Sequence, residues 1–200
     1  MKKRKLKISN GISDQRMRIV FGFMIIMVIF LLIAGIFIFT NFLFQLTDIN
    51  TIEVNYRVFL LESFATGSLI LTGLTLCAMF LYLIIVIVFR NPQKVSKNTV
   101  LKFSLGGIFV LLLTGGLIYY GGSFTYDCVL DMKDYSNGDW KEEELLVKNV
   151  EYMEDGDYII EADHREFFVF GLPITITEGE TYRFTFLDRT SHVLKIEKLK

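Results

Sequence analysis

Three long stretches without a charged residue dominate the hydrophobic pattern of the chain: Ile19–Thr47, Ser63–Phe89 and Phe103–Tyr126. In the middle stretch, 14 of the 21 residues from Leu69 to Phe89 are Leu, Ile, Val or Phe. On the insertion scale these residues together favour the bilayer by roughly 4 to 8 kcal/mol. Each stretch is long enough to cross the hydrocarbon core as a helix. We therefore predict three transmembrane helices, at about residues 19–44, 64–89 and 103–124, within a helical membrane region 19–126.

The first stretch is predicted to be a retained helix. A cleaved signal peptide has an apolar core of about 7 to 15 residues, and Ile19–Thr47 is roughly twice that length. The second helix is expected to end at Arg90, because Asn91-Pro92 removes a backbone donor and restricts the preceding residue.

Basic residues are unevenly distributed among the segments that flank these helices. Seven Lys or Arg precede the first helix, one lies in Asp48–Glu62, and four lie in the loop 90–102. The positive-inside rule then places the basic tail 1–18 and the loop 90–102 in the cytoplasm. Three crossings carry everything after Tyr126 to the outside, so we predict a multi-pass protein of the cell membrane with an extracytoplasmic C-terminal domain.

The connector Asp48–Glu62 has apolar residues at helical spacing and an i,i+4 ion pair, Glu53–Arg57, in the favoured order. This pattern predicts an amphipathic helix at the outer interface that leads into the second span. An irregular loop is the alternative that the pattern leaves open.

After the third helix the pattern changes to short strands. An acidic linker is predicted at 127–141, with a turn at Asn137-Gly138, and a β-domain at 142–200. In its later part Tyr182, Phe184 and Phe186 alternate with polar residues, which is typical of a strand with one buried face. The predicted strands are Leu145–Met153, Tyr158–Ala162, Phe167–Phe170, Ile174–Thr177, Thr181–Leu187 and Val193–Leu199, with Leu194 and Ile196 on one face of the last.

So many short strands in about 60 residues suit a closed or nearly closed barrel, because closure removes exposed sheet edges. The predicted fold class is three transmembrane helices followed by a small all-β domain, an OB-like or SH3-like barrel. Residues 1–126 carry a net charge of +8 and residues 127–200 a net charge of −9. Such an acidic domain would repel phosphates, which excludes nucleic acid as a partner.

Few residues suggest chemistry. Cys77 and Cys128 lie in different environments, so we expect no disulfide; Cys77 is predicted to be a packing residue and Cys128 an unpaired surface or interfacial thiol. His164 and His192 fall in predicted turns, and we expect both to be solvated. With Asp163 and Glu166 nearby, no spacing supplies the three or four ligands of a zinc site, and Ser191 beside His192 cannot form a nucleophile–base pair.

An acidic segment around Asp131 and Asp134 invites comparison with a calcium loop. Counted from Asp134, the EF-hand positions six and twelve hold neither Gly nor Glu. We therefore expect a solvated acidic linker, and the sequence predicts no catalytic residue, no metal ligand, no cofactor and no cofactor-binding residue.

The predicted helices lack ionisable residues, which argues against a transport pathway. Small residues such as Gly67, Gly73 and the paired glycines of the third helix allow close helix packing, within the chain or against another subunit. Gly106 and Gly115 lie on opposite helix faces. Membrane lipid, and a protein partner or a second copy, are the expected partners.

The run Tyr158–Leu199 contains Glu178-Gly179-Glu180-Thr181-Tyr182-Arg183 before an aromatic strand and closes with Val193-Leu194-Lys195-Ile196-Glu197. It resembles the small extracytoplasmic β-barrel modules that end many poorly characterised bacterial membrane proteins. The resemblance covers the last third of the chain. It implies a bacterial envelope location and brings no catalytic residue.

The leading hypothesis is a non-enzymatic envelope protein that binds a partner protein, as an accessory subunit or an immunity-type factor. An extracytoplasmic ligand sensor is the alternative. A membrane enzyme acting on lipid or wall precursors is a third hypothesis, with Glu62, Asp127, Asp131 and His192 as its candidate groups.

Overall fold

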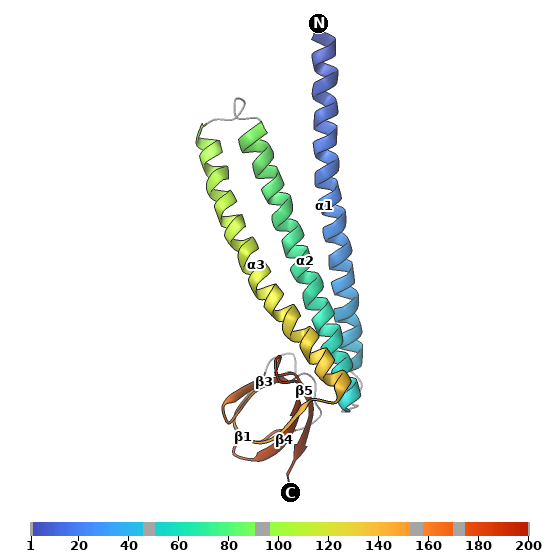
Figure 1. Cartoon of the computed structure of the whole chain (residues 1–200), viewed down its shortest axis with the longest axis vertical. Helices are drawn as coiled ribbons and strands as arrows, with labels where there is room; N and C mark the ends of the chain where they lie inside the picture. Colours follow the sequence, from blue (N-terminus) through green and yellow to red (C-terminus); the bar gives the residue numbers. More distant parts are fainter. Residues whose placement is uncertain (1, 46–50, 91–96, 153–157, 170–174, 200) are drawn as a thin grey trace. The chain divides into compact units, whose positions relative to one another are not determined.

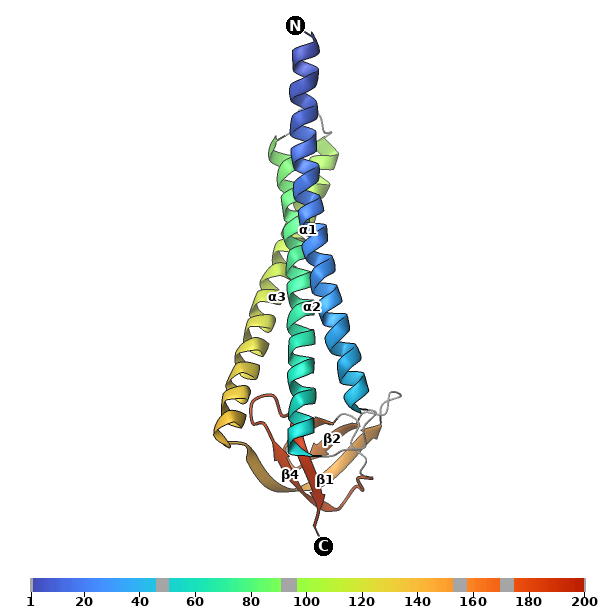
Figure 2. The same cartoon turned by 90° about the vertical axis from the view of Figure 1, so that its right-hand side faces the viewer.

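A computed structural model describes residues 2–45, 51–90, 97–152, 158–169 and 175–199. Three long helices precede one five-stranded antiparallel sheet (Figures 1 and 2), which confirms a helical membrane part followed by a small all-β domain. The elements are α1 (Lys2–Gln45), α2 (Ile52–Arg90), α3 (Lys97–Asn137), β1 (Lys141–Tyr152), β2 (Tyr158–Ala162), β3 (Arg165–Val169), β4 (Thr181–Phe186) and β5 (Val193–Lys198).

All three helices are long and apolar enough to cross a membrane. The qualifying segments are Gln15–Phe44, Ile52–Val86 and Asn98–Asn137, with mean hydropathies of 3.1, 2.6 and 1.9. The connector predicted before the second span is helical from Ile52 onward. Its start at residues 48–50 lies outside the described residues, as do residues 91–96 of the predicted basic loop.

The predicted linker at 127–141 is wrong as a description of local structure, because α3 continues without interruption to Asn137. This part of α3 packs against the sheet domain, and Asp131 lies on the packed face. α3 then ends in a left-handed turn at Gly138 (φ 77°), where the Gly138 and Asp139 N–H groups donate to the carbonyls of Tyr135 and Asp134. Only residues 138–140 separate α3 from β1.

The chain divides into two compact units: Met1–Ala34 with Thr66–Gly122, and Gly35–Ala65 with Ser123–Lys200. Within the first unit, glycines of α2 and α3 allow close helix packing. A Cβ at Gly73 would lie 3.3 Å from Leu117 Cδ1, and a Cβ at Gly121 would lie 2.7 Å from Ile70 Cγ2. On the α1 side, the rings of Phe23 and Tyr82 are 6.2 Å apart.

The sheet of the second unit has the strand order β3-β2-β1-β4-β5 and is not closed. β1 is 12 residues long and serves both halves, because Lys141–Leu146 pairs with β4 and Val147–Tyr152 with β2. The predicted burial of alternate residues in β4 is confirmed. The sheet core contains Leu145, Val147, Ile160, Ala162, Phe167, Val169, Ile176, Tyr182, Phe184, Phe186, Val193 and Ile196.

Two details differ from the alternation pattern. Thr175–Thr177 is not a strand, although Ile176 is buried in the sheet core, and Ile174 lies outside the described residues. In β5 the pairing shifts, since Phe186 faces Val193 while Thr185 faces Lys195. This irregularity separates Leu194 from Ile196, so that Leu194 packs in a different cluster.

Candidate functional site

The second unit contains a tightly packed junction where α2 and α3 meet the β4–β5 loop. Four side chains are buried at its centre: Phe59 of α2, Cys128 of α3, and Leu187 and Leu194 of the sheet domain. Around them lie partly buried hydrophobic residues, namely Ile52, Tyr56, Leu60, Phe124, Met132, Tyr135 and Trp140. We call this set of residues the helix–sheet junction.

The α3 side of the junction has a sequence signal that the prediction missed. Phe124, Cys128, Met132 and Tyr135 recur at i, i+4, i+8 and i+11, which is the spacing of one helix face. Because Asp127, Asp131 and Asp134 lie among these residues, the composition alone predicts a solvated acidic linker there. Tyr135 stacks on Tyr56 with ring centroids 3.4 Å apart and an interplanar angle of 6°.

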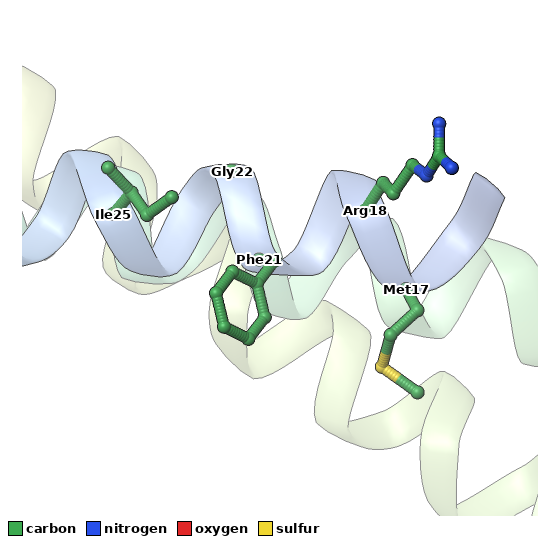
Figure 3. Close-up of a pocket in the computed structure, with 5 residues that line it drawn as sticks. All are labelled: Met17, Arg18, Phe21, Gly22 and Ile25. Atoms are coloured by element: carbon green, nitrogen blue, oxygen red, sulfur yellow. The ribbon is translucent and has the colours of Figure 1, made fainter. Parts of the chain in front are cut away.

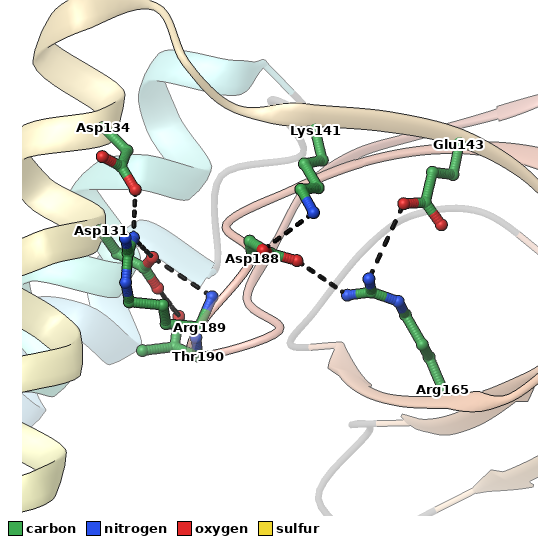
Figure 4. A network of polar contacts seen from close by, with 8 residues as sticks. All are labelled: Asp131, Asp134, Lys141, Glu143, Arg165, Asp188, Arg189 and Thr190. Carbon is green, nitrogen blue, oxygen red and sulfur yellow. Dashed lines mark hydrogen bonds and ion pairs between the residues drawn. The ribbon is translucent and has the colours of Figure 1, made fainter.

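Asp131 is fully buried at this junction, contrary to its predicted solvation. Its Oδ2 accepts hydrogen bonds from the Thr190 N–H (2.8 Å) and the Thr190 hydroxyl (2.6 Å), and Oδ1 accepts one from the Arg189 N–H (3.3 Å). The Arg189 guanidinium bonds to Asp134 and lies 3.5 Å from Asp131 Oδ1 (Figure 4). Asp131 therefore fastens α3 to the β4–β5 loop.

His192 is also buried, which corrects the prediction of a solvated turn residue. Its Nε2 lies 3.2 Å from the carbonyl oxygen of Asn55, so Nε2 carries the proton in the neutral ring. Burial lowers the pKa of His192 from 6.5 to about 4, and the hydrogen bond to Asn55 offsets part of that shift. The Asn55 side chain in turn donates to the carbonyl of Leu194 (2.7 Å).

Glu62 lies between this histidine and the end of α1. Its Oε1 accepts a hydrogen bond from Asn41 Nδ2 (3.1 Å), and its Oε2 lies 4.0 Å from His192 Nδ1. One residue further along α2, the Ser63 hydroxyl donates to Cys128 Sγ at 3.4 Å. Of the four groups considered for a membrane enzyme, the structure thus brings Glu62 and His192 together.

The geometry of that pair favours a structural role. The imidazole is 8% exposed, and its Nε2 is engaged by a main-chain carbonyl of α2. A general acid or base must reach the proton it transfers within about 3 Å. Asp131 is committed to the β4–β5 loop, and Asp127 lies one turn before it on α3. Asp131 and His192, which are buried, thus bond the β4–β5 loop to α3 and α2.

The other predicted positions are placed as follows. His164 is exposed in the β2–β3 turn, where Asp163 has a positive φ of 50°. Within the described residues, no three His, Cys, Asp or Glu side chains come close enough to hold a metal ion. Cys77 and Cys128 are both buried, and both are free thiols.

A second polar cluster stabilises the sheet domain beside the junction (Figure 4). Asp188 pairs with Lys141 (2.9 Å) and Arg165 (3.1 Å), and Arg165 also reaches Glu143 at 3.7 Å. Hydrogen bonds from Lys141 and Arg165 lower the pKa of Asp188 below its ordinary value. The Arg165 guanidinium lies 4.9 Å from the ring centre of Phe186.

The outer face of the β2–β3 hairpin remains exposed. Ile159 pairs directly with Phe168, whose side chain is 49% exposed, and Glu151 of β1 faces Ile159 on the other side. Glu161 pairs directly with Glu166, and both are exposed. We call these five residues the outer hairpin face; it combines an apolar centre with three carboxylates.

In comparisons with known proteins, no family model matches this chain, and no match is found among curated proteins or among solved structures.

Proposed function

We propose that the chain is a non-enzymatic integral membrane protein of a bacterial envelope that binds a partner protein, as an accessory subunit or an immunity-type factor. The outer hairpin face is the observation that carries this proposal. Phe168 is exposed beside the partly buried Ile159, and aromatic residues are enriched in protein interfaces.

The charges of that face indicate the chemistry of the partner. Like charges directly opposite one another destabilise a pair of strands, and Glu161 lies opposite Glu166. Lys or Arg side chains of a partner would relieve this repulsion while its apolar residues cover Phe168. The partner surface is therefore basic around an apolar centre.

Within the membrane, glycines of α3 supply further support. A Cβ at Gly106, Gly115 or Gly116 would meet nothing within 4 Å, so these positions leave room on the helix surface. Helices of a partner protein or of a second copy can approach closely there.

The proposal also includes the finer features of the domain and its location. The strand order and the long shared strand β1 suit an OB-like or SH3-like module. The excess of basic residues in the first 18 residues and in residues 90–102 supports a cytoplasmic N-terminus and an extracytoplasmic sheet domain.

The test places a photo-crosslinking amino acid at position 168 of the full-length chain in its native membrane. A discrete crosslinked partner is expected. Glu161→Lys should reduce the crosslink yield at least about fivefold, because a lysine that repels the basic partner surface replaces a glutamate that attracts it. Crosslinking should also weaken as salt is raised.

Glu142→Lys is the matched control, because Glu142 is an exposed glutamate of β1 that faces Thr185 rather than the outer hairpin face. This variant should keep the crosslink. Loss of the crosslink in both variants, or in neither, would contradict docking at the outer hairpin face.

A ligand sensor is the second candidate, and the helix–sheet junction favours it. The β4–β5 loop is bonded to α3 through Asp131 and contacts α2 through His192. A ligand that moves this loop would move both helices. Trp140, the single tryptophan, lies in the junction, so a ligand that changes its fluorescence in the full-length protein would support a sensor.

A further inference from the structure

An open groove lies along the N-terminal part of α1, away from the helix–sheet junction in sequence. Met17, Arg18, Phe21, Gly22 and Ile25 line it, and its volume is about 470 Å³ (Figure 3). These residues span slightly more than two turns of helix, or about 12 Å along its axis.

The groove exists because Gly22 has no side chain between larger neighbours. A Cβ at Gly22 would meet nothing within 4 Å. Met17, Phe21 and Ile25 are exposed by 65%, 61% and 52%. The lining is therefore apolar apart from the guanidinium of Arg18 at one end.

The position of the groove matches the boundary between headgroups and hydrocarbon. Gln15–Phe44 is the apolar segment of α1, and no charged residue follows Arg18 until Asp48. Residues 2–18 hold seven basic residues against the single acidic residue Asp14. A groove with a positive charge at its headgroup end and an apolar lining beyond it is complementary to an anionic phospholipid, whose phosphate lies in the headgroup region and whose acyl chain lies in the hydrocarbon.

We propose that this groove binds one anionic phospholipid. The Arg18 guanidinium pairs with the phosphate, for which its planar donors are suited, and an acyl chain lies over Gly22 beside Ile25. Basic pockets beside transmembrane helices are known to select anionic headgroups. This lipid site is independent of the protein partner proposed for the sheet domain.

The test titrates the full-length chain in detergent with phosphatidylglycerol or phosphatidylcholine, and native mass spectrometry counts the bound lipids. The wild type should retain one phosphatidylglycerol in preference to phosphatidylcholine. Arg18→Gln should weaken phosphatidylglycerol binding about fivefold, as expected for one cation at a membrane surface. Gly22→Leu fills the groove and should weaken retention of both lipids.

Two matched controls separate a built groove from general charge attraction. Arg16→Gln removes a cation two residues away, about 200° around the helix, and Gly35→Leu enlarges another α1 glycine with open space around it. Both controls should bind phosphatidylglycerol as the wild type does. If Arg16→Gln is as damaging as Arg18→Gln, or if Gly22→Leu has no effect, the groove is not a lipid site.

Discussion

His192 is the residue whose ionisation most directly affects the helix–sheet junction. The ring packs 5.1 Å from Phe59 and lies near Glu62 and the carbonyl of Asn55, with Asp131 also acting on it electrostatically. Burial holds the pKa of His192 at about 4, below its ordinary 6.5. The folded protein therefore binds fewer protons than the unfolded chain between these values, and stability falls as the pH decreases through that window.

We expect the sheet domain to lose about 2 kcal/mol of stability between pH 7.5 and pH 5 through His192 alone, with the loss complete below pH 4. The measurement is chemical unfolding of the full-length protein in detergent, followed by Trp140 fluorescence. Trp140 reports on the junction because its ring lies 5.7 Å from Tyr135.

His192→Gln keeps an N–H donor for the carbonyl of Asn55 but does not titrate. This variant should unfold with a smaller pH dependence than the wild type. An equal pH dependence in both proteins would show that other groups govern it, such as Asp188, whose ion pairs lower its pKa.

At the scale of the element, the close packing of α2 against α3 has its tightest glycine contact at Gly121. A Cβ at Gly121 would lie 2.7 Å from the branched Cγ2 of Ile70, whereas a Cβ at Gly122 would meet nothing within 4 Å. Gly121→Ala should destabilise the full-length protein by about 1–3 kcal/mol through overpacking. Thermal unfolding in detergent measures the effect.

Gly122→Ala is the control for the helix propensity that both substitutions share, and it should be neutral or slightly stabilising. In an Ile70→Ala background, Gly121→Ala should cost less than it does in the wild type, because the opposing methyl group is absent. If Gly121→Ala and Gly122→Ala behave alike, the helices do not pack as described.

The elements also show what local pattern can and cannot predict. Tyr158–Ala162 was predicted with its observed bounds, and the apolar helices followed from length and hydropathy, because both signals are local. The helix at residues 127–137 and the shift at Leu194 were missed. Each is stabilised by contacts between segments more than 50 residues apart, such as Asp131 with Thr190.

The same reason explains the candidate site. No spacing in the sequence connects Asn55 to His192 or Asp131 to Arg189, since each pair is joined only by the fold. Polar residues next to turns are mostly solvated, so burial of His192 and Asp131 was not expected. The stripe from Phe124 to Tyr135 was the available signal for a buried helix face.

At the scale of the whole molecule, the distribution of basic residues predicts the sidedness. Single cysteines can be introduced as Lys3→Cys and as Glu142→Cys, which is exposed on β1, after replacement of Cys77 and Cys128. In intact cells a membrane-impermeant maleimide should label the cysteine at 142 readily. The cysteine at 3 should react only after permeabilisation.

The reverse labelling pattern would overturn the orientation, and labelling of both sites from outside would contradict three crossings. A Ser136→Cys variant should label in the same way as the cysteine at 142, because Ser136 is exposed near the end of α3.

The short connection between α3 and β1 limits how freely the sheet domain can move. Residues 138–140 extend at most about 10 Å. The β4–β5 loop of the sheet domain is also bonded to α3 through Thr190 and to α2 through His192. A domain held this closely does not sweep through solvent as one on a flexible tether does. For the proposed membrane partner, this tether would confine encounters to molecules in or beside the same bilayer. Expression level per unit of membrane area, rather than concentration in bulk, would then govern occupancy.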